Sequence, residues 1–218
     1  GGAKLGLIDG AAAKITPEGV KEALGRTARS IHSVQPTAVS ISQTTERGAI
    51  YRPEEVAAIG ELARTTGLAF HMDGARFANA VAALGRKPAD ISWRGGVELL
   101  SFGATKNGAL AAEAIVCFNS NYAEDIARRR KRGGHLLSKN PYVAAQLLAY
   151  LENDLWLKLA ARANELARRL GEAAGAHLTV PVETNQVFLK PGALGLAKLR
   201  GSGADFYDWG PEGSGEVR

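Results

Sequence analysis

The first 140 residues alternate between short apolar runs and longer segments with a helical hydrophobic pattern. The short runs predict strands at residues 38–42, 68–72, 98–102 and 113–118. The longer segments predict helices over Thr16 to Arg29, Arg52 to Thr66, Arg76 to Leu84 and Tyr122 to Arg132. Strands that alternate with helices in this order indicate an α/β fold, with a mainly parallel sheet flanked by helices.

The pattern changes after residue 140. A segment rich in alanine and leucine, from Pro141 to Leu170, predicts a long connecting helix with a bend near Asn153 and Asp154. Two short runs beyond it predict a strand pair, at residues 178–182 and 186–189. We therefore expect a large domain followed by the connecting helix and part of a smaller C-terminal α+β domain, the two parts being residues 1–140 and 141–218.

Both ends of the chain have unusual features. Residues 201–215 are rich in turn formers and are expected to be weakly ordered, whereas Glu216 to Arg218 is typical of the start of a strand. The chain does not begin with methionine, and no glycine-rich phosphate loop precedes the first helix. We therefore expect the sequence to be a fragment that is cut at both ends.

Composition narrows the class of protein. The 218 residues are 45% hydrophobic and 22% charged, which is ordinary for a globular domain. No apolar run approaches the roughly 20 residues that cross a bilayer, so no membrane partner is expected. A single cysteine, Cys117, cannot form an internal disulfide, which favours a reducing, cytoplasmic location. Cys117 lies in an apolar run and is interpreted as a buried small hydrophobe.

The net charge is +5, and part of the excess lies in one basic cluster, Arg128 to Arg132. Such a cluster can bind nucleic acid. It contains no interleaved aromatic residues, and no zinc or RNA-binding motif accompanies it. A solvated helix end, or a site for a phosphorylated small molecule, is therefore the better interpretation, and no nucleic-acid partner is expected.

The candidate chemistry lies where two predicted strands end. Asp73 and Arg76 follow one strand, in Phe70-His71-Met72-Asp73-Gly74-Ala75-Arg76, and Lys106 follows the next, in Leu99-Leu100-Ser101-Phe102-Gly103-Ala104-Thr105-Lys106-Asn107-Gly108. Ligands of parallel sheets bind outside the carboxyl ends of the strands. A lysine that binds an aldehyde as a Schiff base, and a carboxylate that keeps a pyridine nitrogen protonated, are what a pyridoxal phosphate (PLP) enzyme requires.

Each of these residues also has a purely structural interpretation. Lys106 alone can be a surface charge, and Asp73 can be the N-cap of the helix that follows it. Arg76 can form a surface ion pair with Asp73 or Asp90. His71 lies on the same side of the predicted strand as Asp73, and a hydrogen-bonded core histidine is its more ordinary role.

Taken together, the two motifs resemble the low-specificity L-threonine aldolase family, which belongs to the aldolase and β-eliminating lyase group of fold type I PLP-dependent enzymes. The similarity runs from about residue 15 to residue 192. The segment Arg129 to Lys139 is similar to a basic, glycine-containing segment of that family. In the family this segment reaches the cofactor phosphate of a neighbouring subunit.

The resemblance implies a role for each candidate residue. Lys106 corresponds to the Schiff-base lysine, Asp73 to the partner of the pyridinium nitrogen, and Arg76 to a ligand near the ring oxygen or the substrate. Lys131 and then Arg132 are the best matches to the phosphate ligand. Arg218 resembles the arginine that binds the substrate α-carboxylate, a task that suits a bidentate guanidinium.

The expected reaction is cleavage of L-threonine, L-allo-threonine or a related β-hydroxy-α-amino acid to glycine and an aldehyde. The resemblance also implies a homo-oligomer, a dimer or tetramer with shared active sites. The family's glycine-threonine phosphate loop and its ring-stacking histidine do not occur in these 218 residues, and the sequence does not identify the catalytic base. β-Elimination or transamination on the same fold, and a non-catalytic scaffold, remain as alternatives.

Overall fold

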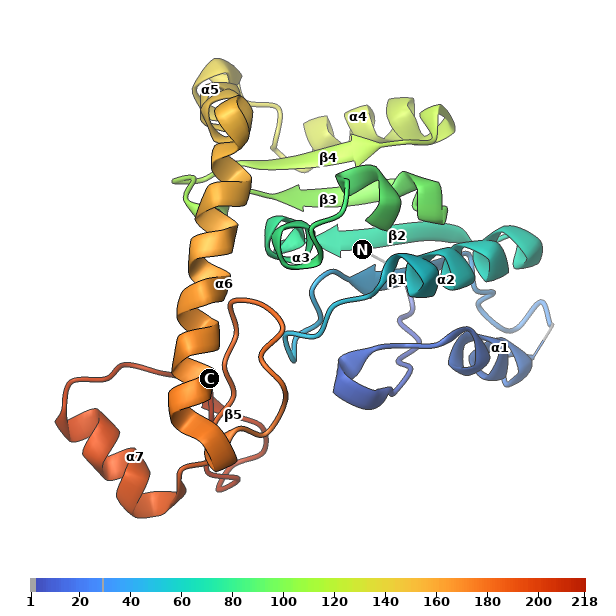
Figure 1. Cartoon of the computed structure of the whole chain (residues 1–218). Coiled ribbons are helices and arrows are strands. Elements are labelled where there is room, and N and C mark those ends of the chain that lie inside the picture. Colours follow the sequence, from blue (N-terminus) through green and yellow to red (C-terminus); the bar gives the residue numbers. More distant parts are fainter. Residues whose placement is uncertain (1–2, 29) are drawn as a thin grey trace.

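Parallel strands form the centre of the molecule. The structure is a computed structural model, and it describes residues 3–28 and 30–218. A four-stranded sheet has the order β1-β2-β3-β4 (Figure 1), with β1 at Ala38–Ser42, β2 at Ala69–Gly74, β3 at Leu99–Gly103 and β4 at Glu113–Cys117. The first three strands are parallel, and β4 runs antiparallel to β3. The predicted mainly parallel sheet is confirmed.

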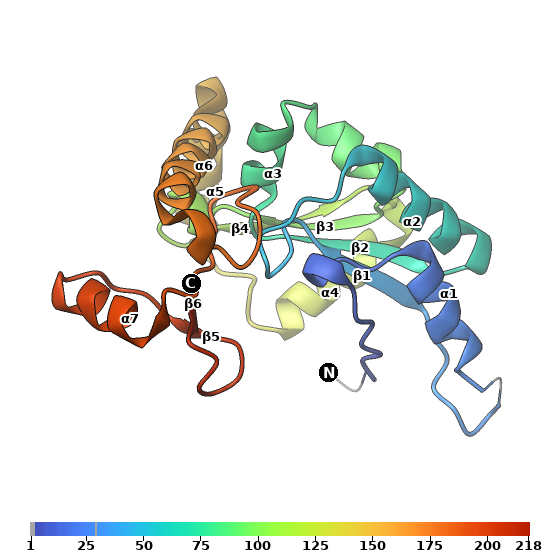
Figure 2. The same ribbon diagram turned by 60° about the horizontal axis from the view of Figure 1, so that its bottom comes forward.

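Helices flank the sheet, as the pattern predicted. They are α1 (Pro17–Gly25), α2 (Pro53–Thr66), α3 (Phe77–Leu84) and α4 (Ala123–Arg132). The α2 and α3 helices cover one face of the sheet, and α4 lies on the other side (Figure 2). The first helix starts where predicted, because the Thr16 hydroxyl accepts a hydrogen bond from the Gly19 amide. It ends earlier than predicted, at Gly25, and Arg29 lies outside the described residues.

Strand alternation divides apolar from polar side chains. The buried positions of the three parallel strands pack toward α2 and α3, and they include Val39, Ile41, Phe70, Met72, Leu100 and Phe102. The intervening positions carry polar residues, namely Ser40, Ser42, His71, Asp73 and Ser101. Because successive strand residues point to opposite faces, these polar side chains share the face that α2 and α3 leave open.

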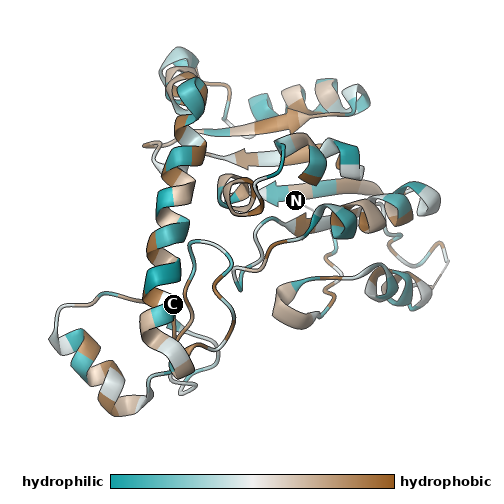
Figure 3. Ribbon diagram, in the orientation of Figure 1, coloured by the Kyte–Doolittle hydropathy of each residue, from teal (hydrophilic) through white to brown (hydrophobic). Residues whose placement is uncertain are grey.

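The long C-terminal helix is broken where a bend was predicted. It consists of α5 (Asn140–Leu151) and α6 (Leu155–Ala174), joined by a single 3₁₀ turn at Glu152–Asp154. Asn153 and Asp154 have φ angles of 52° and 55°, in the left-handed region that interrupts a helix. Polar and apolar turns alternate along α6 (Figure 3), and the helix runs down the side of the molecule with its upper part packed on α3.

The C-terminal region corrects two predictions. The strand pair expected at residues 178–182 and 186–189 forms only in part, as one antiparallel bridge between Leu178 and Leu189. Leu189 also pairs with Val217, since both of its main-chain groups bond to that residue at 2.8–2.9 Å. The tail after residue 201 contains antiparallel strands that order it, β5 (Asp208–Trp209) and β6 (Glu216–Val217), and it follows a helix that was not predicted, α7 (Gly192–Gly201). The division into two domains at residue 140 stays a prediction.

Two further expectations concern single features. None of the helices within residues 3–28 and 30–218 is long and apolar enough to cross a membrane. Cys117 is half-buried rather than fully buried, and its thiol donates a hydrogen bond to the carbonyl oxygen of Asn119 at 2.9 Å. It lies near the start of the β4-to-α4 connection, where packing is less complete than in the core.

Candidate active site

Asp73 and Lys106 lie at the same edge of the sheet. Asp73 is the penultimate residue of β2, where it is in register with Ser42 of β1 and Ser101 of β3. Lys106 follows β3, in the short 3₁₀ turn Thr105–Asn107. Because β2 and β3 are parallel, their carboxyl ends meet at one edge (Figure 1), which is where ligands bind in such sheets.

The turn that carries Lys106 is anchored by its neighbour Asn107. The buried Asn107 amide donates hydrogen bonds to the Tyr150 hydroxyl at 2.6 Å and to the Trp156 carbonyl oxygen at 2.9 Å. Tyr150 belongs to α5 and Trp156 to α6, so the turn is fixed to both helices. Lys106 itself is exposed, and its amine forms no hydrogen bond or ion pair within the described part of the chain. The turn is rigid and the amine is accessible.

Two glycines allow this turn to pack closely. A Cβ at Gly103 would lie 2.7 Å from the Cα of Ala75, so a glycine is required for the end of β3 to touch the turn after β2. Gly108 has a φ of +115°, and a Cβ there would lie 2.9 Å from the Leu159 side chain. Only glycine satisfies both conditions without strain. These contacts bring the Asp73 turn and the Lys106 turn together.

Replacing Asn107 with alanine is expected to lower the free energy of unfolding by about 2 kcal/mol, because the buried Tyr150 hydroxyl and Trp156 carbonyl would each lose their partner. Urea unfolding followed by circular dichroism measures the change. Asn121→Ala is the matched control, since Asn121 is exposed. Equal stability of the two variants would contradict the anchoring role of Asn107.

Asp73 caps the turn after β2 and does not cap a helix. Its Oδ1 atom accepts a hydrogen bond from the Ala75 amide at 2.9 Å. The α3 helix begins at Phe77, and Arg76 occupies its N-cap position without a side-chain capping bond. The helix N-cap alternative for Asp73 is therefore wrong. The carboxylate is exposed and oriented by its own turn, so it can accept a hydrogen bond from a further donor.

Arg76 and Arg218 share one charged environment beside Asp73. Burial lowers the pKa of the Arg76 guanidinium below its ordinary value, the positive charge of Arg218 lowers it further, and the carboxylates of Glu46 and Asp73 raise it. Arg218 lies 3.7 Å from Glu46, with its guanidinium 4.3 Å from the centre of the Trp209 ring. The structure thus brings Arg218 to the edge where Arg76 and Asp73 lie. Two guanidinium groups whose charges influence one another favour an anionic ligand.

The expected alternative partner of Arg76 is engaged elsewhere. Asp90 forms its ion pair with Arg94, four residues later, at 2.8 Å. Within residues 3–28 and 30–218, Arg76 forms no ion pair shorter than 4 Å. The surface ion-pair interpretation of Arg76 is therefore not supported by the geometry.

Lys131 and Arg132 belong to the exposed last turn of α4, on the side of the sheet opposite α2 and α3 (Figure 2). Neighbouring arginines in this cluster pair with acids one turn earlier, Arg128 with Glu124 and Arg129 with Asp125, each at 2.6 Å. No hydrogen bond or ion pair among the described residues joins Lys131 or Arg132 to Asp73, Arg76 or Lys106.

His71 is held between two serines. Its Nδ1 atom lies 2.8 Å from the Ser40 hydroxyl and its Nε2 atom 3.0 Å from the Ser101 hydroxyl. The three side chains lie on β1, β2 and β3, and His71 precedes Asp73 by two residues on β2. Burial lowers the pKa of the imidazole below its ordinary value, and the Asp73 carboxylate partly opposes the shift. His71 is therefore a neutral, hydrogen-bonded histidine, as its structural interpretation predicted.

The lowered pKa of His71 predicts a loss of stability in mild acid. As the pH falls through the ordinary histidine value of 6.5, the unfolded chain binds a proton at this residue before the folded chain does. Unfolding is thereby favoured below that pH, and the contribution of His71 vanishes above it. Urea unfolding at pH 7.5 and 5.5 should show a smaller acid-induced loss in His71→Gln than in the wild type. The exposed His32→Gln variant should behave as the wild type does.

Sequence reasoning missed three residues at this edge: Glu46, Arg47 and Asn107. The first two lie in the loop that follows β1, whose carboxyl end opens on the same edge as β2 and β3. The carboxyl-end rule that selected Asp73 and Lys106 therefore also selects this loop. For Asn107 the available signal was an amide next to the lysine, within a run of small residues.

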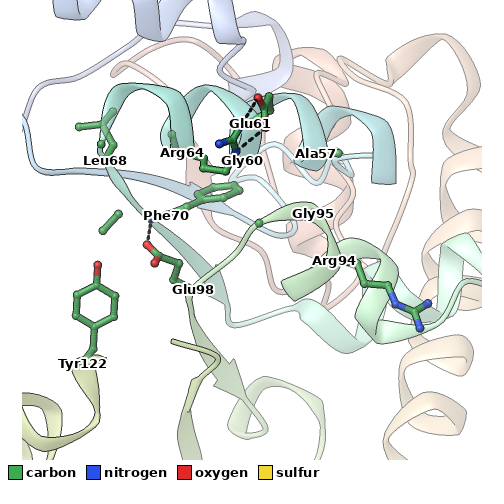
Figure 4. Close-up of a pocket in the computed structure, with 14 residues that line it drawn as sticks. Ala57, Gly60, Glu61, Arg64, Leu68, Phe70, Arg94, Gly95, Glu98 and Tyr122 are labelled. Carbon is green, nitrogen blue, oxygen red and sulfur yellow. Dashed lines mark hydrogen bonds and ion pairs between the residues drawn. The ribbon is translucent and has the colours of Figure 1, made fainter. Parts of the chain in front are cut away.

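One cavity lies away from this chemistry. It has a volume of about 770 Å³ and opens near the amino ends of β2 and β3, between residues that include Gly60, Phe70, Glu98 and Tyr122 (Figure 4). Glu98 is already engaged there, since its carboxylate accepts hydrogen bonds from the Phe70 amide at 3.1 Å and from the Asn119 side chain. The carboxylate thus serves the main chain, and the cavity holds no counterpart of the Asp73 and Lys106 pair.

The residues present fit the ring end of PLP. An accessible lysine amine suits an aldehyde, and an oriented carboxylate without a second protein partner suits a pyridinium N–H. The phosphate end requires cations or clustered amide donors, and no hydrogen bond or ion pair among the described residues ties Lys131 or Arg132 to this edge. The fit is therefore to one part of the cofactor.

The chain is similar to known proteins over most of its length. The profile of the beta-eliminating lyase family matches residues 1–192. The low specificity L-threonine aldolase of Pseudomonas aeruginosa is 43% identical over 217 residues, covering 97% of this chain and 62% of the relative. Its namesake from a Pseudomonas sp. is 42% identical over 222 residues, covering the whole chain and 63% of the relative. The chain thus spans about three fifths of the length of these relatives.

Solved structures give the same fold. A threonine aldolase from Leishmania major superposes with a TM-score of 0.84 at 29% identity, covering 94% of this chain and 60% of that one. A putative L-allo-threonine aldolase from Listeria monocytogenes, at 21% identity and a TM-score of 0.67, supports the fold alone. With the family profile covering most of its length and two relatives above 40% identity, this chain belongs to the beta-eliminating lyase family of fold type I PLP-dependent enzymes.

Proposed function

We propose that this chain is part of a PLP-dependent aldehyde-lyase. The enzyme would cleave L-threonine, L-allo-threonine or a related β-hydroxy-α-amino acid to glycine and an aldehyde. The single observation that carries the proposal is the pairing of an accessible Lys106 with an oriented Asp73 at one sheet edge. The 43% identity to a low specificity L-threonine aldolase over almost the whole chain directs it to this reaction.

The proposed roles follow from the chemistry of each side chain. Bound PLP supplies an electron sink for the charge left on the substrate α-carbon when the Cα–Cβ bond breaks. Lys106 is the proposed attachment point for the cofactor aldehyde. Asp73 holds the proton on the ring nitrogen, which keeps the ring electron-deficient. Arg76 is the proposed ligand of the ring oxygen or the substrate.

Arg218 is the proposed ligand of the substrate α-carboxylate, because a guanidinium can donate two parallel hydrogen bonds to a carboxylate. Lys131 and Arg132 are proposed to bind the cofactor phosphate of a neighbouring subunit, since no hydrogen bond or ion pair among the described residues joins them to Asp73 in one chain. This role requires a homo-oligomer. We propose such an assembly, and a cytoplasmic location, which the single unpaired cysteine supports.

Borohydride reduction in the presence of PLP, followed by peptide mass spectrometry, tests the proposal. It should be run on this chain and on a chain extended to the length of its relatives. We expect the pyridoxyl group on Lys106, and then release of an aldehyde and glycine from L-threonine. Ammonia and a keto acid as products would replace the aldol reaction with β-elimination or transamination. No label at Lys106 in either chain would favour a non-catalytic scaffold.

A further inference from the structure

Two reciprocal ion pairs join the loop after β1 to strand β6. Arg47 donates hydrogen bonds to both carboxylate oxygens of Glu216, at 2.8 and 2.7 Å. Its neighbour Glu46 faces Arg218, two residues beyond Glu216, at 3.7 Å. In the loop, Glu46 thus pairs with Arg218 and Arg47 pairs with Glu216, which lie in and directly after β6. The side chains of Arg47 and Glu216 are largely shielded, at 24% and 14% exposure, so this pair is less screened than a surface pair.

Stacked rings extend this contact to Arg218. The Arg47 guanidinium lies over the fully buried Phe188 ring, 4.6 Å from its centre. Phe188 packs edge-on against Trp209, with ring centres 5.4 Å apart, and Trp209 in turn lies under the Arg218 guanidinium. The stack therefore runs from Arg47 to Arg218 through two aromatic rings. Planar guanidinium groups stack on such rings with a defined orientation.

The main chain of β6 is fixed on both sides of this stack. Val217 exchanges two hydrogen bonds with Leu189, and Arg218 exchanges two with Tyr207, all between 2.8 and 3.1 Å. Glu216, directly before these residues, also receives a hydrogen bond from the Thr179 hydroxyl. Glu216 is thus the point at which β6 is attached to the sheet edge that carries Asp73. The direction in which Arg218 points depends on that attachment.

We propose that Arg47, through its bidentate pair with Glu216, is a positioning residue that holds Arg218 at the carboxyl edge of the sheet. The inference rests on the proposed function, in which Arg218 binds the substrate α-carboxylate. Arg47 itself does not touch the substrate. Its effect is to fix β6, so that the Arg218 guanidinium meets the carboxylate without first being ordered.

Charge alone does not explain the arrangement. A single positive charge opposite Glu216 could come from lysine, whereas the planar fork of arginine fixes both carboxylate oxygens and stacks on Phe188. The pKa values agree with a firm pair, since the Glu216 hydrogen bond raises that of Arg47 and the Arg47 hydrogen bond lowers that of Glu216. A test should therefore change the geometry of the Arg47–Glu216 pair as well as its charge.

The test compares three variants of the chain extended to the length of its relatives. Arg47→Gln removes the pair, and Arg47→Lys keeps the charge but loses the fork. Arg168→Gln is the matched control, because Arg168 forms a bidentate pair with Glu165 on the same helix, α6, at 2.8 and 2.7 Å. We expect Arg47→Gln to raise KM for L-threonine about 10-fold with kcat changed less than about 3-fold. Arg47→Lys should fall between it and the wild type, and the control should match the wild type.

A second readout does not depend on turnover. Hydrogen exchange of the amides of residues 207–218 should be faster in Arg47→Gln than in the wild type, because the attachment of β6 is lost. Unchanged exchange there would overturn the proposal. Faster exchange with an unchanged KM, or an equal loss of kcat and of substrate affinity, would also overturn it. If the wild type does not act on threonine the proposed function fails, and the exchange measurement still decides whether Arg47 holds Arg218.

Discussion

Lys106→Ala is expected to abolish borohydride-dependent labelling by PLP and to lower threonine cleavage by roughly 1000-fold or more. The proposed attachment point is the lysine amine, and no other lysine lies in the rigid turn after β3. The loss should be purely chemical, because the side chain is exposed and makes no hydrogen bond within the part of the chain that the structure describes. Peptide mass spectrometry and an aldehyde assay measure both effects.

The exposed Lys21→Ala variant is the matched control for this substitution. It removes a lysine from α1 and should keep both labelling and turnover. Circular dichroism should show equal unfolding free energies for the two variants. A pyridoxyl group found at another lysine of the wild type would contradict the assignment of Lys106.

Asp73→Asn is expected to lower kcat by about 100- to 1000-fold, because an amide cannot stabilise a protonated ring nitrogen as a carboxylate does. The substitution is close to isosteric, and the asparagine oxygen can still accept the hydrogen bond from Ala75. Stability should therefore change little. Steady-state kinetics with L-threonine, together with urea unfolding, separates the two effects.

The neighbouring acid Asp90 provides the control for Asp73. Asp90→Asn breaks an exposed ion pair with Arg94 and should leave kcat unchanged. A wild-type kcat in Asp73→Asn would show that the carboxylate does not act on the ring nitrogen. A large loss of stability in the same variant would instead indicate that Asp73 serves the turn.

The sequence was sufficient to predict the strands of the sheet because their local pattern and their tertiary role agree. The alternation in residues 38–42 corresponds to one buried and one open face, and β1 has these bounds. The direction of β4 was not predicted. Its signal is the short connection of residues 104–112, since a parallel crossover requires a dozen residues or more, whereas an antiparallel return requires few.

The strand pair predicted within residues 178–189, of which one bridge forms, shows the opposite case. Local propensity favoured a hairpin, but side chains in its turn and at the start of its second strand are bound by a distant loop. The Thr184 hydroxyl donates to the Gly48 carbonyl oxygen, and the Gln186 amide donates to that of Thr45, both at 3.1 Å. These partners are 136 and 141 positions away in the sequence, so no local pattern indicates them.

The candidate site likewise contains residues that could be predicted from the sequence and residues that could not. Asp73 and Lys106 could be predicted because each follows a strand and carries an unmistakable reactive group. Arg47 and Glu216 could not, since each is an ordinary charged residue until folding brings together two positions that are 169 residues apart in the sequence. Reactive groups can be identified in a sequence, whereas the residues that orient them depend on long-range contacts.

The Asn107 anchor couples two properties that are usually separate. The residue next to Lys106 also joins α5 to α6 through Tyr150 and Trp156. A substitution that loosens those helices therefore reaches the reactive amine through one side chain. Variants selected for thermal tolerance at Tyr150 or Trp156 should consequently change turnover as well, so that heat resistance and catalytic rate cannot be optimised independently in this chain.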